Sequence, residues 1–220
     1  GGLAAGLLLV ISFLFANNMS LALTPERWAM WFDRPGGWVL NLGEPQLWPR
    51  WLHMVIGAVA VGGLFIALLQ DNRLRRGEAA ARERRDWALR FFTHGTLLQM
   101  LVGIWWLMAL RTDVMKLFMG GSPLASALLL LGIAAGVVAV ALGFQKKVRA
   151  AVWLTVITIV LMALMREVVR FGYLAPHYHP RQLAVESQPG PMILFLAVFV
   201  VGAGCVVTML RLAASGRKEG

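Results

Sequence analysis

The sequence predicts an all-α protein, a polytopic transmembrane bundle of about six helices. Hydrophobic residues make up 59% of the 220 residues, charged residues only 15%, and the mean hydropathy is +0.69. A soluble domain of this composition would expose a surplus of apolar surface. The chain also contains six apolar runs of roughly the 20 residues that a helix needs to cross a bilayer. We therefore expect one transmembrane domain over residues 1–220.

The six expected spans follow one another with connections of unequal length. The first run, 1–17, lacks the basic segment and the cleavage site of a signal peptide. It begins with Gly-Gly and no initiator Met, so residues are expected to be missing upstream of Gly1. The later runs are 48–69, 87–110, 123–144, 150–173 and 191–210. The long segment 18–47 is rich in tryptophan, which favours the headgroup region. This segment is expected to lie on the outer membrane surface as short amphipathic pieces.

Basic residues are distributed unevenly between the two sides of this topology. Twelve of the 21 Lys and Arg residues lie in 71–86, in 145–149 and in the tail 211–220, whereas six lie in the opposite loops. The positive-inside rule makes the first side cytoplasmic, which places the C-terminus inside and residues 18–47 outside. The net charge of +10 thus indicates the topology of a multi-pass protein of the bacterial inner membrane. No nucleic-acid partner is expected, because no recognition motif accompanies the charge.

The cysteine count limits the redox chemistry of the chain. Cys205 is the only cysteine, which excludes a disulfide scaffold, a covalent c-type haem and a cysteine-ligated metal cluster built from this chain alone. Any redox centre must therefore use His or Met ligands.

His53 is the first polar residue that the membrane does not explain. It lies five residues into its span, about 8 Å below the outer interface, and Gly57 follows one turn later. A histidine beside glycines suits a flat macrocycle, because the imidazole ligates the iron and the glycine leaves room for the ring. The alternative is a histidine that hydrogen-bonds between helices, with the glycines serving close packing.

Met100 and His94 share the third span at different depths. Met100 lies about 15 Å from its outer end and His94 roughly 24 Å. Axial ligands must approach one iron at nearly the same height, so Met100 is a candidate to oppose His53, whereas His94 would serve an inner site or pack. The alternative for Met100 is core packing, since the chain has 11 methionines.

Two further groups of polar residues lie toward the outer side. Arg166 and Arg170 stand one turn apart at a depth comparable to that of His53, where two guanidinium groups would pair with haem propionates. The alternative is snorkelling to the headgroups, helped by Glu167. His177 and His179 follow in the next loop, as candidates for a metal or for proton transfer at a quinol site, or as exposed loop residues.

Residues 11–71 contain the sequences ISFLFANNMSLALTPERW and NLGEPQLWPRWLHMVIGAVAVGGLFIALL, and residues 99–103 read QMLVG. In the order of these elements the chain resembles subunit I of the cytochrome bd quinol oxidases. The resemblance covers about a quarter of the chain and implies that His53 ligates a low-spin b-type haem (heme b). It also implies that Met100, which is followed by Val102-Gly103, is the second ligand.

The sequence departs from that family in ways that bear on its function. The first helices of the family would lie upstream of Gly1, the glutamates around the oxygen-reducing haem have no clear equivalent, and a short arginine-rich turn replaces the long quinol loop. Oxygen reduction by this chain alone is therefore not expected. The resemblance is to membrane cytochromes that work beside periplasmic multihaem proteins.

The expected function is electron transfer between a membrane quinone or quinol and a periplasmic cytochrome c partner, within a complex of membrane subunits. His53 and Met100 would ligate the haem, and Arg166 with Arg170 would hold its propionates. The alternative is a haem-free transporter or an assembly subunit with His53 and the arginines lining a substrate path. A visible spectrum discriminates between the two.

Overall fold

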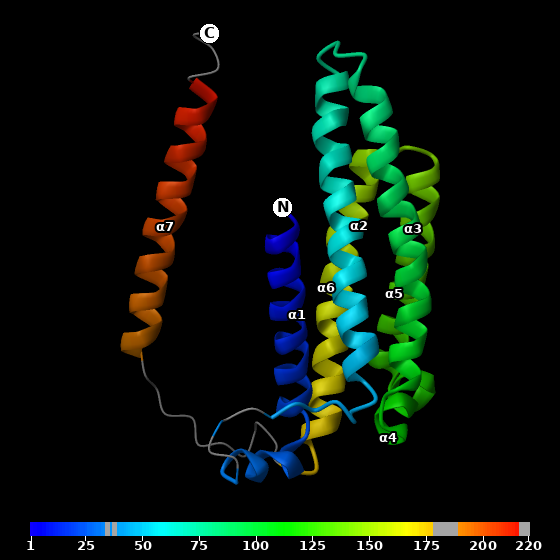
Figure 1. Cartoon of the computed structure of the whole chain (residues 1–220), viewed down its shortest axis with the longest axis vertical. Helices are drawn as coiled ribbons and strands as arrows, with labels where there is room; N and C mark the ends of the chain where they lie inside the picture. Colours follow the sequence, from blue (N-terminus) through cyan, green and yellow to red (C-terminus); the bar gives the residue numbers. More distant parts are fainter. Residues whose placement is uncertain (34–35, 37–38, 178–188, 216–220) are drawn as a thin grey trace. The chain divides into compact units, whose positions relative to one another are not determined.

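The structure is a computed structural model that describes residues 1–33, 36, 39–177 and 189–215. It confirms the all-α class, because the described residues form helices and no strand. The chain forms two compact units, 1–178 and 179–220. Six helices in the described part are long and apolar enough to cross a membrane: α1 (Gly2–Ala22), α2 (Leu47–Leu74), α3 (Ala81–Met108), α5 (Pro123–Phe144), α6 (Val148–Leu174) and, in the second unit, α7 (Pro189–Ser215) (Figure 1).

The connections hold the remaining short elements. η1 (Pro25–Trp31) follows α1, and α4 (Thr112–Lys116) with the π-helical turn η2 (Leu117–Gly121) joins α3 to α5. Each of the six expected spans overlaps one helix, although the first begins one residue before α1 and the third ends two residues after α3. The largest difference is that α3 begins at Ala81, six residues before the expected 87. An apolar run marks the part of a helix that crosses the membrane, and these helices extend beyond it.

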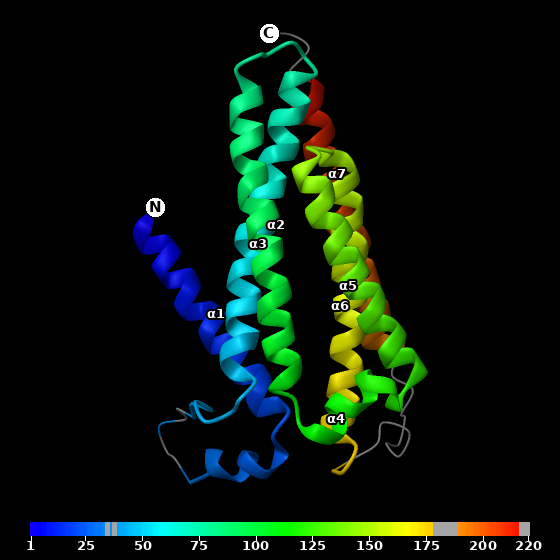
Figure 2. The same cartoon turned by 90° about the vertical axis from the view of Figure 1, so that its right-hand side faces the viewer.

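The helices of the first unit pair as two antiparallel hairpins, α2 with α3 and α5 with α6 (Figure 2). We call the end formed by the turns 75–80 and 145–147 the basic end, and the end formed by 23–46 and 109–122 the loop end. Glycines bring α2 against α3: a Cβ on Gly63 would lie 2.8 Å from Ala88 O, and one on Gly95 would lie 2.9 Å from Ala60 Cβ. Such small residues let helix backbones approach closely in membranes.

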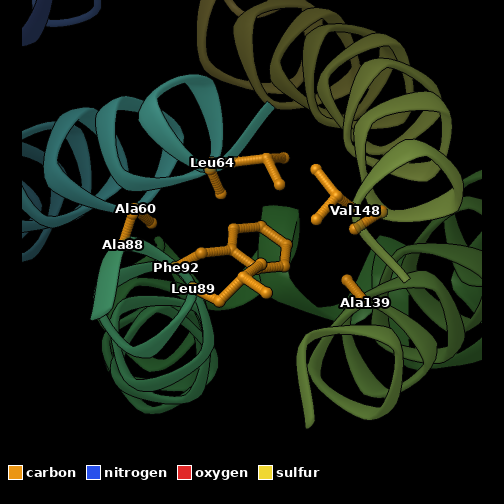
Figure 3. Packing of buried hydrophobic residues seen from close by; sticks show 9 residues of the cluster. Ala60, Leu64, Ala88, Leu89, Phe92, Ala139 and Val148 are labelled. Carbon is orange, nitrogen blue, oxygen red and sulfur yellow. The ribbon is translucent and has the colours of Figure 1, made fainter. Parts of the chain in front are cut away.

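An apolar cluster joins the two hairpins toward the basic end. Phe92 of α3 and Leu64 of α2 lie beside Ala139 of α5 and Val148 of α6, and all four are almost fully buried (Figure 3). A second cluster lies toward the loop end around Phe118, Val114 and Val169. There Tyr173 Oη accepts a hydrogen bond of 2.6 Å from the backbone N–H of Arg111, which ties the end of α6 to the α3–α4 connection. Between the clusters, residues 50–59 of α2 and 152–168 of α6 include no buried residue.

Two buried asparagines fasten the segment after α1 to the end of that helix. The backbone N–H of Asn41 donates to Asn17 Oδ1 at 2.7 Å, and Asn17 Nδ2 donates to Val39 O at 3.0 Å. Asn41 is fully buried, its Nδ2 donates to Ser20 Oγ at 3.2 Å, and its Oδ1 accepts from Arg27. The polar residues that end the first span are therefore a docking site for the segment that follows.

Asn41→Ala is expected to loosen this segment without affecting the helical hairpins. The substitution removes the acceptor of the Arg27 guanidinium and the donor to Ser20 Oγ, and the loss of these hydrogen bonds costs about 1 to 3 kcal/mol. Limited proteolysis between residues 23 and 46 should become faster in the variant. Asn18→Ala is the matched control, because Asn18 is exposed. Equal proteolysis of both variants would show that the buried hydrogen bonds contribute little.

Candidate functional site

His53 lies on α2 in the segment between the two apolar clusters. Its carbonyl oxygen accepts a hydrogen bond of 2.6 Å from Gln99 Nε2 of α3. Its ring nitrogen Nδ1 is buried and has no hydrogen-bond partner among the described residues. Gly103 stands beside the ring, since a Cβ there would lie 3.8 Å from His53 Cε1. His53 is thus a half-buried imidazole whose Nδ1 is unpaired, next to a position that carries no side chain.

Gly57 is used for helix packing. A Cβ on Gly57 would clash with Nε2 of Gln99, so the amide of Gln99 occupies the space above this glycine. The same amide reaches the carbonyl of His53. A macrocycle at His53 would therefore have to lie on another side of the ring, and Gly103 is the glycine that leaves space there.

Met100 lies close to His53 in depth. His53 is opposite Gly103, and Met100 precedes Gly103 by three residues, or about 4.5 Å along the helix axis. The Met100 sulfur faces α5, because a Cβ on Gly136 would lie 3.6 Å from it. The two proposed ligands therefore occupy nearly the same level, while the described contacts do not bring the sulfur against the imidazole.

His94 lies closer to the basic end than His53 does, on an exposed face of α3. It precedes Gly103 by nine residues, or about 13 Å along the axis. Its Nδ1 is 2.8 Å from Arg90 O, and since a carbonyl only accepts, Nδ1 carries the proton and Nε2 is free to accept. Trp87, Arg90, Phe91 and His94 line a shallow groove of about 230 Å³. His94 does not join the His53 region.

Arg50 is a half-buried polar residue one turn from His53, on the side of the loop end. It lies three residues before His53 and so on the same face of α2. Its Nη2 donates to Gln46 Oε1 at 3.0 Å, and Gln46 Nε2 donates to Glu44 Oε1 at 3.1 Å. Its guanidinium also interacts electrostatically with Tyr173 and Arg166 of α6. Arg50 thus lies on the loop-end side of His53, where the carboxylate of Glu44 and the guanidinium of Arg166 both act on it.

The arginines of α6 pair with the acid between them. Glu167 is 3.3 Å from Arg170 Nη1 and 3.9 Å from Arg166 Nη2, and all three side chains are largely exposed. Arg166 has the looser contact and is the one that interacts with Arg50. Of these two arginines, Arg166 is therefore the one that acts electrostatically on Arg50 of α2.

His177 contacts an acid from the opposite end of the unit's sequence. Its Nε2 is 2.9 Å from Glu26 Oε1 of η1. A hydrogen bond to its own backbone, and after it the contact with His177, lower the pKa of Glu26. His179, its expected companion, lies outside the described residues. In the described part of the chain, His177 therefore links η1 to the end of α6.

Sequence reasoning missed two residues of this region, Arg50 and Gln99. Arg50 had a usable signal, because it is a charged residue at helical spacing from His53. Gln99 interrupts an apolar run directly before Met100, yet no spacing rule predicts that its amide reaches a backbone carbonyl on α2.

Comparisons of the chain with protein-family models, with curated proteins and with solved structures give no match. The resemblance to the cytochrome bd subunit therefore stays a prediction from the sequence.

Proposed function

We propose that the chain is a membrane-embedded b-type cytochrome of a quinol-linked electron-transfer complex, with His53 as an axial ligand of haem b. The observation that carries the proposal is the buried Nδ1 of His53, which has no partner in the described part of the chain. Leaving such an atom unpaired costs about 1 to 3 kcal/mol. No hydrogen bond within the described part of the chain engages the His53 ring, so a ring nitrogen is available for ligation of iron.

The surrounding residues fit the polar edge of such a cofactor. Arg50, one turn from His53 on α2, and Arg166 of α6, which acts electrostatically on Arg50, are the guanidinium groups that would pair with haem propionates, because carboxylates in a low dielectric require such partners. Met100, at nearly the same depth as His53, is the second proposed ligand. Bound haem supplies reversible one-electron transfer, and His/Met ligation raises its potential, which suits acceptance of electrons from quinol.

The proposed setting follows from the charge distribution. The protein would lie in the bacterial inner membrane with its basic end and its C-terminus in the cytoplasm. A quinone or quinol would exchange electrons with the haem, and a periplasmic cytochrome c would be the partner on the loop side, beside other subunits of the complex. The chain would then be an oxidoreductase subunit that does not itself reduce oxygen.

The test of the proposal is a reduced-minus-oxidised visible spectrum of the purified chain, with a count of extractable haem per chain. We expect an α-band of low-spin haem b and about one haem per chain. A protein that is folded and loaded in a haem-producing host, yet free of haem, would contradict the proposal.

A second candidate function is that of a haem-free assembly subunit or transporter. Two contacts favour it: Gln99 fills the space above Gly57, and the Met100 sulfur packs against Gly136. Both complete the helix packing without a cofactor. The same spectrum decides, because this function predicts no haem signal.

Replacement of Arg166 by Gln is expected to lower the midpoint potential of the haem. The change leaves a propionate less compensated, and extra negative charge disfavours reduction of the iron. The loss of one charge-assisted hydrogen bond, about 1 to 3 kcal/mol, limits the shift to about 40 to 130 mV for a one-electron couple. Redox titration measures it. Arg170→Gln is the control with a smaller expected shift, because Arg170 is held by Glu167; equal potentials in both variants and the parent would remove Arg166 from the site.

A further inference from the structure

A polar cavity of about 330 Å³ lies at the basic end, away from the His53 region. Its charged lining comes from three elements: Asp71 of α2, Arg75 directly after it, Lys146 and Lys147 of the α5–α6 turn, and Arg149 of α6. The cavity is thus assembled where the two hairpins meet, and it exists only when both are in place.

The carboxylates of this region are outnumbered by cations. Asp71, only 8% exposed, is 3.0 Å from Arg75 and within 4 Å of Arg85 and Arg149. Asp86 contacts Arg85 and holds Lys146 at 2.6 Å. Four cations, Arg75, Arg85, Arg149 and Lys146, therefore share two carboxylates, and Lys147 adds a further positive charge to the cavity lining.

Two of the cavity's cations remain available to a ligand. Lys147 has no carboxylate within salt-bridge distance among the residues that the structure describes. Arg149 donates from Nη2 to Asn72 Oδ1 at 3.2 Å and is 3.9 Å from Asp71, a long contact, but its side chain is 57% exposed and keeps further N–H donors for a ligand. Clustered Lys and Arg side chains recognise phosphate oxygens through charge-assisted hydrogen bonds.

An apolar surface continues from this cavity along α6. Trp153 follows Arg149 by one turn and is 72% exposed. Ile157 follows Trp153 by one turn and is 54% exposed. These three positions share one face of the helix, because each is four residues after the last. A ligand with a phosphate at Arg149 and hydrocarbon along Trp153 and Ile157 matches both surfaces.

We propose that this cavity binds the phosphate of an anionic phospholipid, whose acyl chains lie along the exposed face of α6. The headgroup bridges the α5–α6 turn and the end of α2, and it neutralises part of the excess charge. Basic pockets where membrane helices end are suited to such headgroups, because each nearby cation adds to the attraction. A soluble phosphate offers the same oxyanion, but it has no hydrocarbon to contact Trp153 and Ile157.

Native mass spectrometry of the delipidated full chain tests the proposal, with phosphatidylglycerol, phosphatidylcholine and inorganic phosphate added separately. We expect phosphatidylglycerol to bind about tenfold or more tightly than phosphatidylcholine. Lys147→Gln with Arg149→Gln should remove this preference. Arg82→Gln with Arg84→Gln is the matched control, because it removes two exposed cations at the same end that do not line the cavity.

The outcomes separate the explanations. If the control pair weakens phosphatidylglycerol binding as much as the cavity pair, general surface charge explains the binding and the site is overturned. If inorganic phosphate binds and phosphatidylglycerol shows no preference over phosphatidylcholine, the lipid assignment is wrong. Should the double variant not fold, Lys147→Gln alone gives the same comparison, because the contacts of Lys147 that hold the turn are backbone hydrogen bonds, which glutamine retains.

Discussion

His53→Ala is expected to abolish the low-spin haem b spectrum and to leave the helical bundle intact. The imidazole is the proposed ligand, so its loss removes the axial bond to the iron. The fold should survive because Gln99 bonds to the backbone carbonyl of residue 53, which alanine retains. The measurements are the reduced-minus-oxidised spectrum and the helical content by circular dichroism.

The matched control for this variant is His94→Ala. His94 also lies in a membrane helix, but it is exposed and its ring bonds only to the carbonyl of Arg90 among the described residues. Its replacement should leave the spectrum unchanged. A normal spectrum in His53→Ala would refute the proposed ligation, and loss of the spectrum only in His94→Ala would move the haem to the basic side of the bundle.

Gly63→Val is expected to cause the largest loss of stability among single substitutions in the α2–α3 hairpin. Its Cβ would lie 2.8 Å from Ala88 O, 2.9 Å from Phe91 Cβ and 3.1 Å from Phe92 N. Two of these atoms belong to the backbone of α3, so the clash is relieved only by separating the helices. Overpacking of this kind costs about 1 to 3 kcal/mol or more. Thermal unfolding in detergent should show a clearly lower Tm.

Gly62→Val is the control for that experiment. The two glycines are neighbours in the same helix, and a Cβ on Gly62 would meet nothing within 4 Å. The change in helix propensity is the same in both variants, so the difference in Tm isolates the contact with α3. Similar melting of the two variants would mean that α2 and α3 are held less closely than the structure indicates.

The spans were predictable because the length of an apolar run reports the thickness of the membrane. α5, expected at 123–144, has these bounds in the structure. The start of α3 was not predictable in this way, since its first turns carry Arg82, Arg84 and Arg85 and lie outside the apolar run. Helical hydrogen bonds continue past the hydrophobic region, and hydropathy does not report them.

The depth of each candidate side chain was also predictable, whereas its direction was not. Rise per residue places His53 near Met100 and far from His94, and the register of α2 against α3 agrees. The side chain that packs over Gly57 depends on the rotation of α2 and α3 about their axes. The partner of His177 depends on which segment, distant in sequence, packs beside the end of α6. Gln99 fills the space above Gly57, and Glu26 reaches His177 from a position 151 residues away.

The close contact of α2 with α3 bears on how the protein enters the membrane. α3 has the lowest hydropathy of the six candidate spans and carries Arg90, His94 and Gln99. Taken alone, it would leave the translocation machinery only at considerable cost. α2 precedes it, supplies a carbonyl for Gln99, and offers glycines against which its backbone fits. We therefore expect α2 and α3 to enter the lipid together as a hairpin, because the more apolar α2 offsets the cost of inserting α3.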